Sequence, residues 1–96
     1  MAGEAKLQDL ILKDLRYLGK NVECFKIKSA SDNGVPDIFF TTIKTGPVFV
    51  EVKDKEKKPR KIQQSIINSI NDNGCKAYSC DSWESWVALK RVVGLD

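Results

Sequence analysis

The chain has 96 residues, of which 42% are hydrophobic and 30% are charged, and these values predict one compact domain over residues 1–96. A formal net charge of +3 is too small to indicate a nucleic-acid partner by itself. No apolar run approaches the ~20 residues that a membrane-spanning helix needs, so we expect no membrane partner.

The residue types that are absent narrow the possible chemistry. There is no histidine, which excludes Ser–His–Asp and Cys–His nucleophilic sites and zinc sites with histidine ligands. Cys24, Cys75 and Cys80 lack metal-ligand spacing, and the N-terminal MAGEAKLQDL has no apolar signal core. We therefore expect reduced thiols, a cytoplasmic location, and any enzymatic chemistry to rest on carboxylates and lysine, with or without a metal.

The N-terminal third predicts a helix and a strand. Apolar side chains recur at helical spacing over residues 4–18, including Leu10 and Leu18, and Gly19 stops this helix. Residues 21–28 alternate as a strand, and residues 29–34 form a polar loop rich in turn formers.

A β-hairpin is predicted next. Residues 35–43 form its first strand, residues 44–46 its tight turn, and Pro47 opens its second strand. In that second strand the sequence VFVEVK places valines and charged residues on alternate faces.

The C-terminal half predicts a helix, a strand and a helix. Pro59 fits the first turn of a helix running to about Asn73, and Gly74 ends it. Residues 75–80 form a fourth strand, and residues 81–93 form the last helix. The order αβββαβα predicts an α/β fold in which helices flank a mixed central sheet.

Two features of the last helix bear on its start and its packing. Asp81 and Glu84 have the spacing of a capping box. Trp83 and Trp86 share one face with Leu89 or Lys90, where they either pack in the core or build a dimer interface; we expect at least one tryptophan to be in the core.

The hairpin brings charged side chains together at one end. Glu51 and Lys53 project from the same face of their strand, and counting outward from the turn brings Asp37 close to them. Two carboxylates at this distance repel each other unless one is protonated or a cation lies between them. Oxygen ligands suit Mg²⁺ or Mn²⁺, and Lys53 could hold a nucleophilic water or neutralise charge on phosphorus. The alternative is a salt bridge that closes a strand end.

The segments GVPDIFF, VFVEVKDKEKKPRKIQ and NGCKAYSCDS together resemble the PD-(D/E)xK nuclease superfamily. More narrowly, they are similar to the VRR-NUC domains, which include small stand-alone phage and bacterial proteins. The resemblance extends from Glu4 to about Trp86 and implies a restriction-endonuclease-like fold. It also implies a location in a bacterial cell or a phage-infected host.

The resemblance assigns roles to particular residues. It implies that Asp37 and Glu51 bind the metal and that Lys53 is the catalytic lysine. It implies two more metal ligands, Glu4 and the backbone carbonyl of Val52; the alternative for Glu4 is a favourable acid in a helix's first turn.

The resemblance also implies a site glutamine at the start of the helix after the hairpin. Gln63 matches it and would act as a catalytic residue, and the neighbouring Gln64 stays an alternative.

Residues 53–61, KDKEKKPRK, which we call the basic segment, contain six Lys or Arg and two acids. Charge runs are usually solvated loops. Beside a phosphate-cleaving site, we expect DNA contacts instead. The residues concerned are Lys55, Lys57, Lys58, Arg60 and Lys61.

The sequence therefore predicts a metal-dependent, structure-selective DNA endonuclease. By resemblance it would act like a Holliday-junction resolvase, on branched or junction DNA and as a homodimer. One alternative is a non-catalytic nucleic-acid-binding module on the same fold. Another is a purely structural or protein-interaction domain, which would neither bind nor cut DNA.

Overall fold

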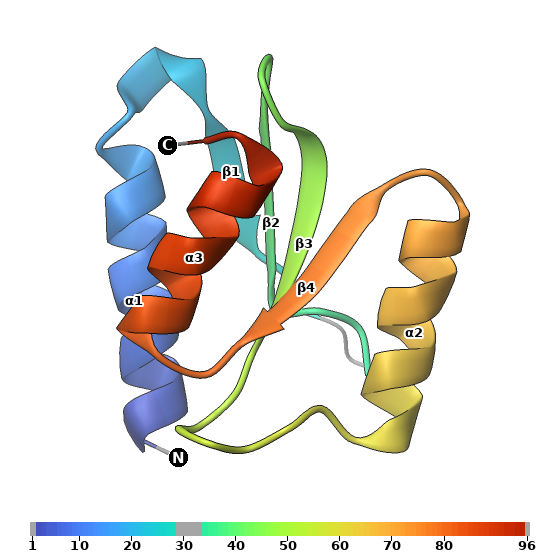
Figure 1. Cartoon of the computed structure of the whole chain (residues 1–96). Helices are drawn as coiled ribbons and strands as arrows, with labels where there is room; N and C mark the ends of the chain where they lie inside the picture. The colour runs from blue at the N-terminus through green and yellow to red at the C-terminus, as the bar shows by residue number, and fades with distance from the viewer. Residues whose placement is uncertain (1, 29–33, 96) are drawn as a thin grey trace.

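The computed structural model describes residues 2–28 and 34–95 (Figure 1). Its helices are α1 (Ala2–Arg16), the 3₁₀ helix η1 (Gly19–Asn21), α2 (Lys61–Asp72) and α3 (Trp83–Val93). Its strands are β1 (Glu23–Lys26), β2 (Ile38–Thr42), β3 (Gly46–Val52) and β4 (Lys76–Cys80). The order of α-helices and strands confirms the predicted αβββαβα arrangement. Most of the loop expected at residues 29–34 lies outside the described residues.

The four strands form one mixed sheet in the order β1-β2-β3-β4. β1, β2 and β3 pair antiparallel, and β3 pairs parallel with β4 after the crossover through α2. In Figure 1, α1 and α3 lie next to each other and α2 stands beside β4. The sheet therefore lies between two helical layers, as the α/β prediction requires.

The alternation in β3 separates the core from the polar face. Val48, Val50 and Val52 are fully buried in a cluster that includes side chains of α1 and α3. Burial of each valine stabilises the fold by roughly 1.5–3 kcal/mol. Phe49 and Glu51 point to the opposite face, because successive side chains alternate across a strand.

The first helix differs from its prediction at both ends and in its apolar face. It begins at Ala2 and ends at Arg16, two residues earlier than expected. Leu12 is buried, whereas Leu10 is 41% exposed and Leu18 follows the helix. Leu12 belongs to the same buried cluster as residues of both the sheet and α3. The buried face of α1 therefore includes Leu12 rather than Leu10.

The start of α3 also corrects a prediction. Ser82, not Asp81, is the N-cap: its Oγ accepts a hydrogen bond of 3.1 Å from the Ser85 N–H. Trp86 is fully buried, with its ring edge-on to Phe40 at 5.9 Å, whereas Trp83 is 41% exposed. The expectation that at least one tryptophan is in the core is confirmed.

Within residues 2–28 and 34–95, none of the helices combines the length and apolar character required to cross a membrane. All three cysteines are free thiols, of which Cys80 is buried and the other two are partly buried.

Candidate metal centre

The register of the hairpin brings Asp37 and Glu51 to the same end of the sheet. Ile38 pairs with Val50, so the next position outward places Asp37 beside Glu51. The Asp37 N–H donates a hydrogen bond of 3.0 Å to the Val50 carbonyl. Asp37 lies one residue before β2 rather than inside it, because the ladder ends at Ile38.

The approach to Asp37 is shaped by Gly34. Its φ of +95° is a conformation that glycine adopts readily, and a Cβ there would lie 3.0 Å from Ile66 Cδ1. The chain therefore passes close to α2 before Pro36, which is fully buried, directs it into β2. These contacts aim the Asp37 side chain at the end of β3.

Three carboxylates converge at this end of the sheet. Glu4, in the first turn of α1, joins Asp37 and Glu51, and one oxygen from each lies within 4.8 Å of the others. A hard divalent cation such as Mg²⁺ or Mn²⁺ prefers such oxygen ligands. The predicted set of acidic ligands is thus brought together by three separate elements of the chain.

Glu51 is the most deeply buried of the three acids, at 2% exposure. Its Oε2 accepts a hydrogen bond of 2.9 Å from Gln63 Nε2, whereas its Oε1 is buried with no hydrogen-bond partner within the described chain. Burial, and then the nearby Asp37 carboxylate, raise the pKa of Glu51 to about 7. A buried acceptor without a partner is costly, and a cation would compensate it, so these residues fit a metal.

Asp37 has a different environment. Its Oδ2 accepts a hydrogen bond of 2.8 Å from the Val52 N–H, which fixes the carboxylate beside the end of β3. Burial raises the pKa of Asp37, the Val52 bond lowers it, and Glu4 raises it further. The net direction is upward, because burial outweighs the hydrogen bond. Val52 thus lies at the site, with its N–H already bound to Asp37.

Gln63 links Glu51 to Lys53. Its Oε1 accepts hydrogen bonds from the Arg60 N–H at 2.8 Å and from Lys53 Nζ at 3.4 Å. Gln64 is exposed and donates instead to Asn68 Oδ1. Of the two glutamines left open by the sequence, the structure brings Gln63 to the carboxylates.

The backbone N–H of Arg60 is a site contact that the sequence reasoning missed. Gln63 lies three residues after Arg60, the N-cap of α2, and its side chain reaches back to the cap N–H as in a capping box. A glutamine at this spacing from a helix start is the signal that would have predicted the contact.

The basic segment runs from Lys53 to the start of α2. Its side chains at Lys55, Lys57, Lys58, Arg60 and Lys61 are all exposed. The structure thus leaves these five cations accessible to a large anion.

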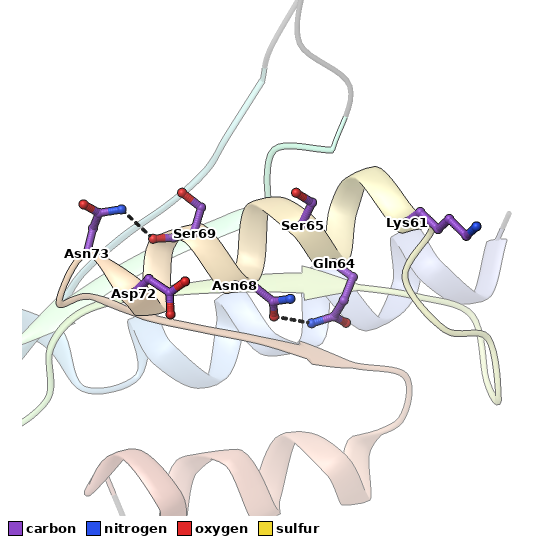
Figure 2. A pocket seen from close by; sticks show the side chains of 7 residues that line it. All are labelled: Lys61, Gln64, Ser65, Asn68, Ser69, Asp72 and Asn73. Atoms are coloured by element: carbon purple, nitrogen blue, oxygen red, sulfur yellow. Dashed lines mark hydrogen bonds between the residues drawn. The ribbon is translucent and has the colours of Figure 1, made fainter.

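An open hollow of about 550 Å³ lies along the outer surface of α2 (Figure 2). Uncharged polar side chains dominate its lining, which includes Gln64, Ser65, Asn68 and Ser69. None of the three carboxylates lines it. The hollow is therefore separate from the candidate metal centre.

Comparison with solved structures identifies the fold. A structure described as a VRR_NUC domain matches with a TM-score of 0.80, covering 93% of this chain and 95% of that chain. The chain has the VRR-NUC fold. This confirms the resemblance inferred from the GVPD and EVK segments, at the level of fold and at 22% sequence identity. No family model matches the sequence of this VRR-NUC-like chain, and no curated protein matches it significantly.

Proposed function

We propose that the protein is a nuclease that uses a divalent metal to hydrolyse phosphodiester bonds in DNA. The observation that carries this proposal is the buried Oε1 of Glu51, which lacks a partner among the described residues and lies within a cluster of three carboxylates. A structural salt bridge would pair such an atom with a cation or a donor from the protein. The VRR-NUC fold supports the same proposal, that the protein is a nuclease.

In this proposal Glu4, Asp37 and Glu51 hold Mg²⁺ or Mn²⁺, with the carbonyl of Val52 as a further ligand. When bound, such a metal polarises a phosphate oxygen and lowers the pKa of bound water. The protein's own contribution is to orient the ligands: the Val52 N–H holds Asp37, and Gln63 holds Glu51.

Lys53 is the proposed catalytic lysine. Its Nζ is held 3.4 Å from Gln63 Oε1, and Gln63 in turn contacts Glu51. Lys53 would thus be placed beside the metal ligands, where an ammonium group can orient the attacking water and neutralise charge that develops on phosphorus. Gln63 would act by positioning both Lys53 and Glu51.

The proposed substrate is branched DNA. The exposed cations of the basic segment suit the phosphate backbone, which carries no sequence information directly. A chain of 96 residues has little surface for reading bases, so we propose recognition of DNA shape, as in a junction resolvase acting as a homodimer. Exposed Trp83 is available to such a dimer, whereas buried Trp86 is not.

The experiment is a cleavage assay with a labelled four-way junction, run with Mg²⁺, Mn²⁺ or EDTA, beside flap, splayed-arm and duplex substrates. We expect cleavage with metal, none with EDTA, and none for Lys53→Ala. Lys44→Ala is the matched control, because Lys44 is an exposed lysine in the turn at the other end of the hairpin. Binding without cutting in any metal would support the alternative, a non-catalytic nucleic-acid-binding module. Neither binding nor cutting would contradict both.

A further inference from the structure

The basic segment is anchored to its surroundings through its backbone. At its start, the Lys53 N–H donates a hydrogen bond of 2.9 Å to the Cys80 carbonyl. Further along, the Glu56 N–H donates a hydrogen bond of 2.9 Å to Asp81 Oδ2. Within the segment, the Lys57 N–H donates to the Asp54 carbonyl at 2.9 Å. The basic segment therefore contains a turn whose backbone is held in place by these hydrogen bonds.

Glu56 adopts a backbone conformation that needs support. Its φ is +65°, in the left-handed region that residues other than glycine seldom adopt. Such a conformation persists where surrounding contacts hold it. The hydrogen bond to Asp81 is the contact from outside the segment that the Glu56 N–H makes.

The segment also touches α1. A Cβ on Gly3 would lie 2.7 Å from Asp54 Oδ1, so the Asp54 carboxylate lies close to the backbone of Gly3. Gly3 directly precedes Glu4, one of the three clustered carboxylates. The same turn thus packs against the part of α1 that brings Glu4 to the site.

We propose that Asp81 is a positioning residue for DNA binding. Its carboxylate fixes the turn at Glu56, so that Lys55, Lys57 and Lys58 present a preformed cationic surface to the phosphate backbone. Asp81 was expected to cap α3, but Ser82 does so, which leaves the Asp81 side chain available for this contact. The inference rests on the proposed function, because it assigns a role within DNA recognition.

The direction in which Asp81→Ala changes the affinity for DNA distinguishes a positioning role from a purely electrostatic one. Asp81 is an acid close to a group of cations, so removing its charge alone should strengthen binding to a polyanion. If Asp81 holds the turn, removing its hydrogen-bond acceptor should weaken binding instead, because the lysines must then be ordered when DNA binds. The two explanations predict opposite changes for Asp81→Ala.

The test compares Asp81→Ala with Asp81→Asn, which removes the charge but keeps an oxygen acceptor. Affinity for a labelled four-way junction is measured by fluorescence anisotropy in EDTA over a range of salt concentrations. We expect Asp81→Asn to bind at least as tightly as the wild type, and Asp81→Ala to bind about fivefold more weakly, the effect of losing one hydrogen bond. Ser82→Ala is the control for α3, since it removes the cap but leaves Asp81 in place.

Amide hydrogen exchange gives a readout that does not depend on DNA. The Glu56 N–H should exchange faster in Asp81→Ala than in the wild type, Asp81→Asn or Ser82→Ala. Equal affinity of the two Asp81 variants, or unchanged exchange at Glu56, would overturn the inference. A wild type that binds no DNA would contradict the proposed function and with it the role in DNA binding. The exchange data would then still decide whether Asp81 holds the turn.

Discussion

Gln63 Nε2 donates a hydrogen bond of 2.9 Å to Glu51 Oε2 and thereby ties the start of α2 to the end of β3. The Arg60 N–H binds the other end of the same amide, at Gln63 Oε1, and so fixes which way the amide points. Oε2 of Glu51 therefore has a protein partner, whereas Oε1 has none among the described residues and is the atom that we propose binds the metal.

Gln63→Ala should lower both the affinity for Mn²⁺ and the cleavage rate by about 10- to 100-fold, the usual cost of losing a group that orients a metal ligand. Mn²⁺ titration by calorimetry and the junction assay measure the two effects. Gln64→Ala is the matched control and should behave as wild type, because Gln64 contacts Asn68 on the exposed side of α2. Equal losses in both variants would mean that Gln63 has no special role.

The stability of the metal-free protein should fall as pH rises. The pKa of Glu51 is raised from 4.5 to about 7, so the folded chain holds this proton more tightly than the unfolded chain does. The resulting stability is fully present below about pH 4.5 and is lost as pH rises through about 7, on the order of 3 kcal/mol. Asp37 shifts in the same direction. Urea unfolding in EDTA at about pH 5 and about pH 8 measures the loss.

Glu51→Gln is the control for this pH effect. The variant cannot ionise at this position, so the difference in unfolding free energy between the two pH values should shrink and leave the part due to Asp37. Saturating Mg²⁺ should stabilise the wild type at the higher pH more than it stabilises the variant. A wild type whose stability does not change between the two pH values would show that Glu51 titrates normally.

Gly34→Ala should destabilise the protein by about 1–3 kcal/mol and weaken Mn²⁺ binding. The alanine would have to adopt a φ of +95°, and its Cβ would approach Ile66 Cδ1 to 3.0 Å and the Ile62 backbone to 3.3 Å. Gly74→Ala is the matched control: it has a φ of +92°, and a Cβ there meets nothing within 4 Å. Urea unfolding should show a smaller loss for Gly74→Ala, with Mn²⁺ affinity unchanged. A larger loss for Gly74→Ala would refute the packing role of Gly34.

The two tryptophans of α3 should differ sharply on substitution. Trp86→Ala removes a fully buried ring and should cost about 3–5 kcal/mol, whereas Trp83→Ala should cost less than about 1 kcal/mol. Trp86 also donates to Asp14 Oδ2 at 2.8 Å, a bond between α3 and α1 that the substitution would break. Chemical denaturation compares the free energies of unfolding of the two variants.

Sedimentation of Trp83→Ala adds a test of the proposed dimer, which should dissociate more readily without this exposed ring.

The convergence of Asp37, Glu51 and Lys53 was predictable from local rules. Alternation along a strand puts Glu51 and Lys53 on one face, and a tight turn fixes the residue that each hairpin position opposes. The observed turn occupies residues 43–45, one residue earlier than predicted, so Gly46 rather than Pro47 opens β3. The register, with Thr42 opposite Gly46 and Ile38 opposite Val50, differs from the expected one by about two residues and still brings Asp37 beside Glu51. Both rules act over a few residues, so they need no knowledge of the rest of the fold.

The contacts that could not be predicted depend on how distant elements meet. Asp81 satisfies the spacing of a capping box, yet its side chain binds the Glu56 N–H, 25 residues earlier in the chain. Leu10 and Leu12 fit an apolar helix face almost equally well, and only the folded core, which includes Leu12 but not Leu10, distinguishes them. Choosing Gln63 over Gln64 likewise requires knowing which side of α2 turns toward β3.

The proposed metal centre is most directly tested by a crystal of the protein grown with Mn²⁺ and measured for anomalous scattering. The proposal predicts a peak bounded by carboxylate oxygens of Glu4, Asp37 and Glu51, with the ion bound to Oε1 of Glu51. These carboxylates turned apart, with no anomalous peak between them, would contradict it.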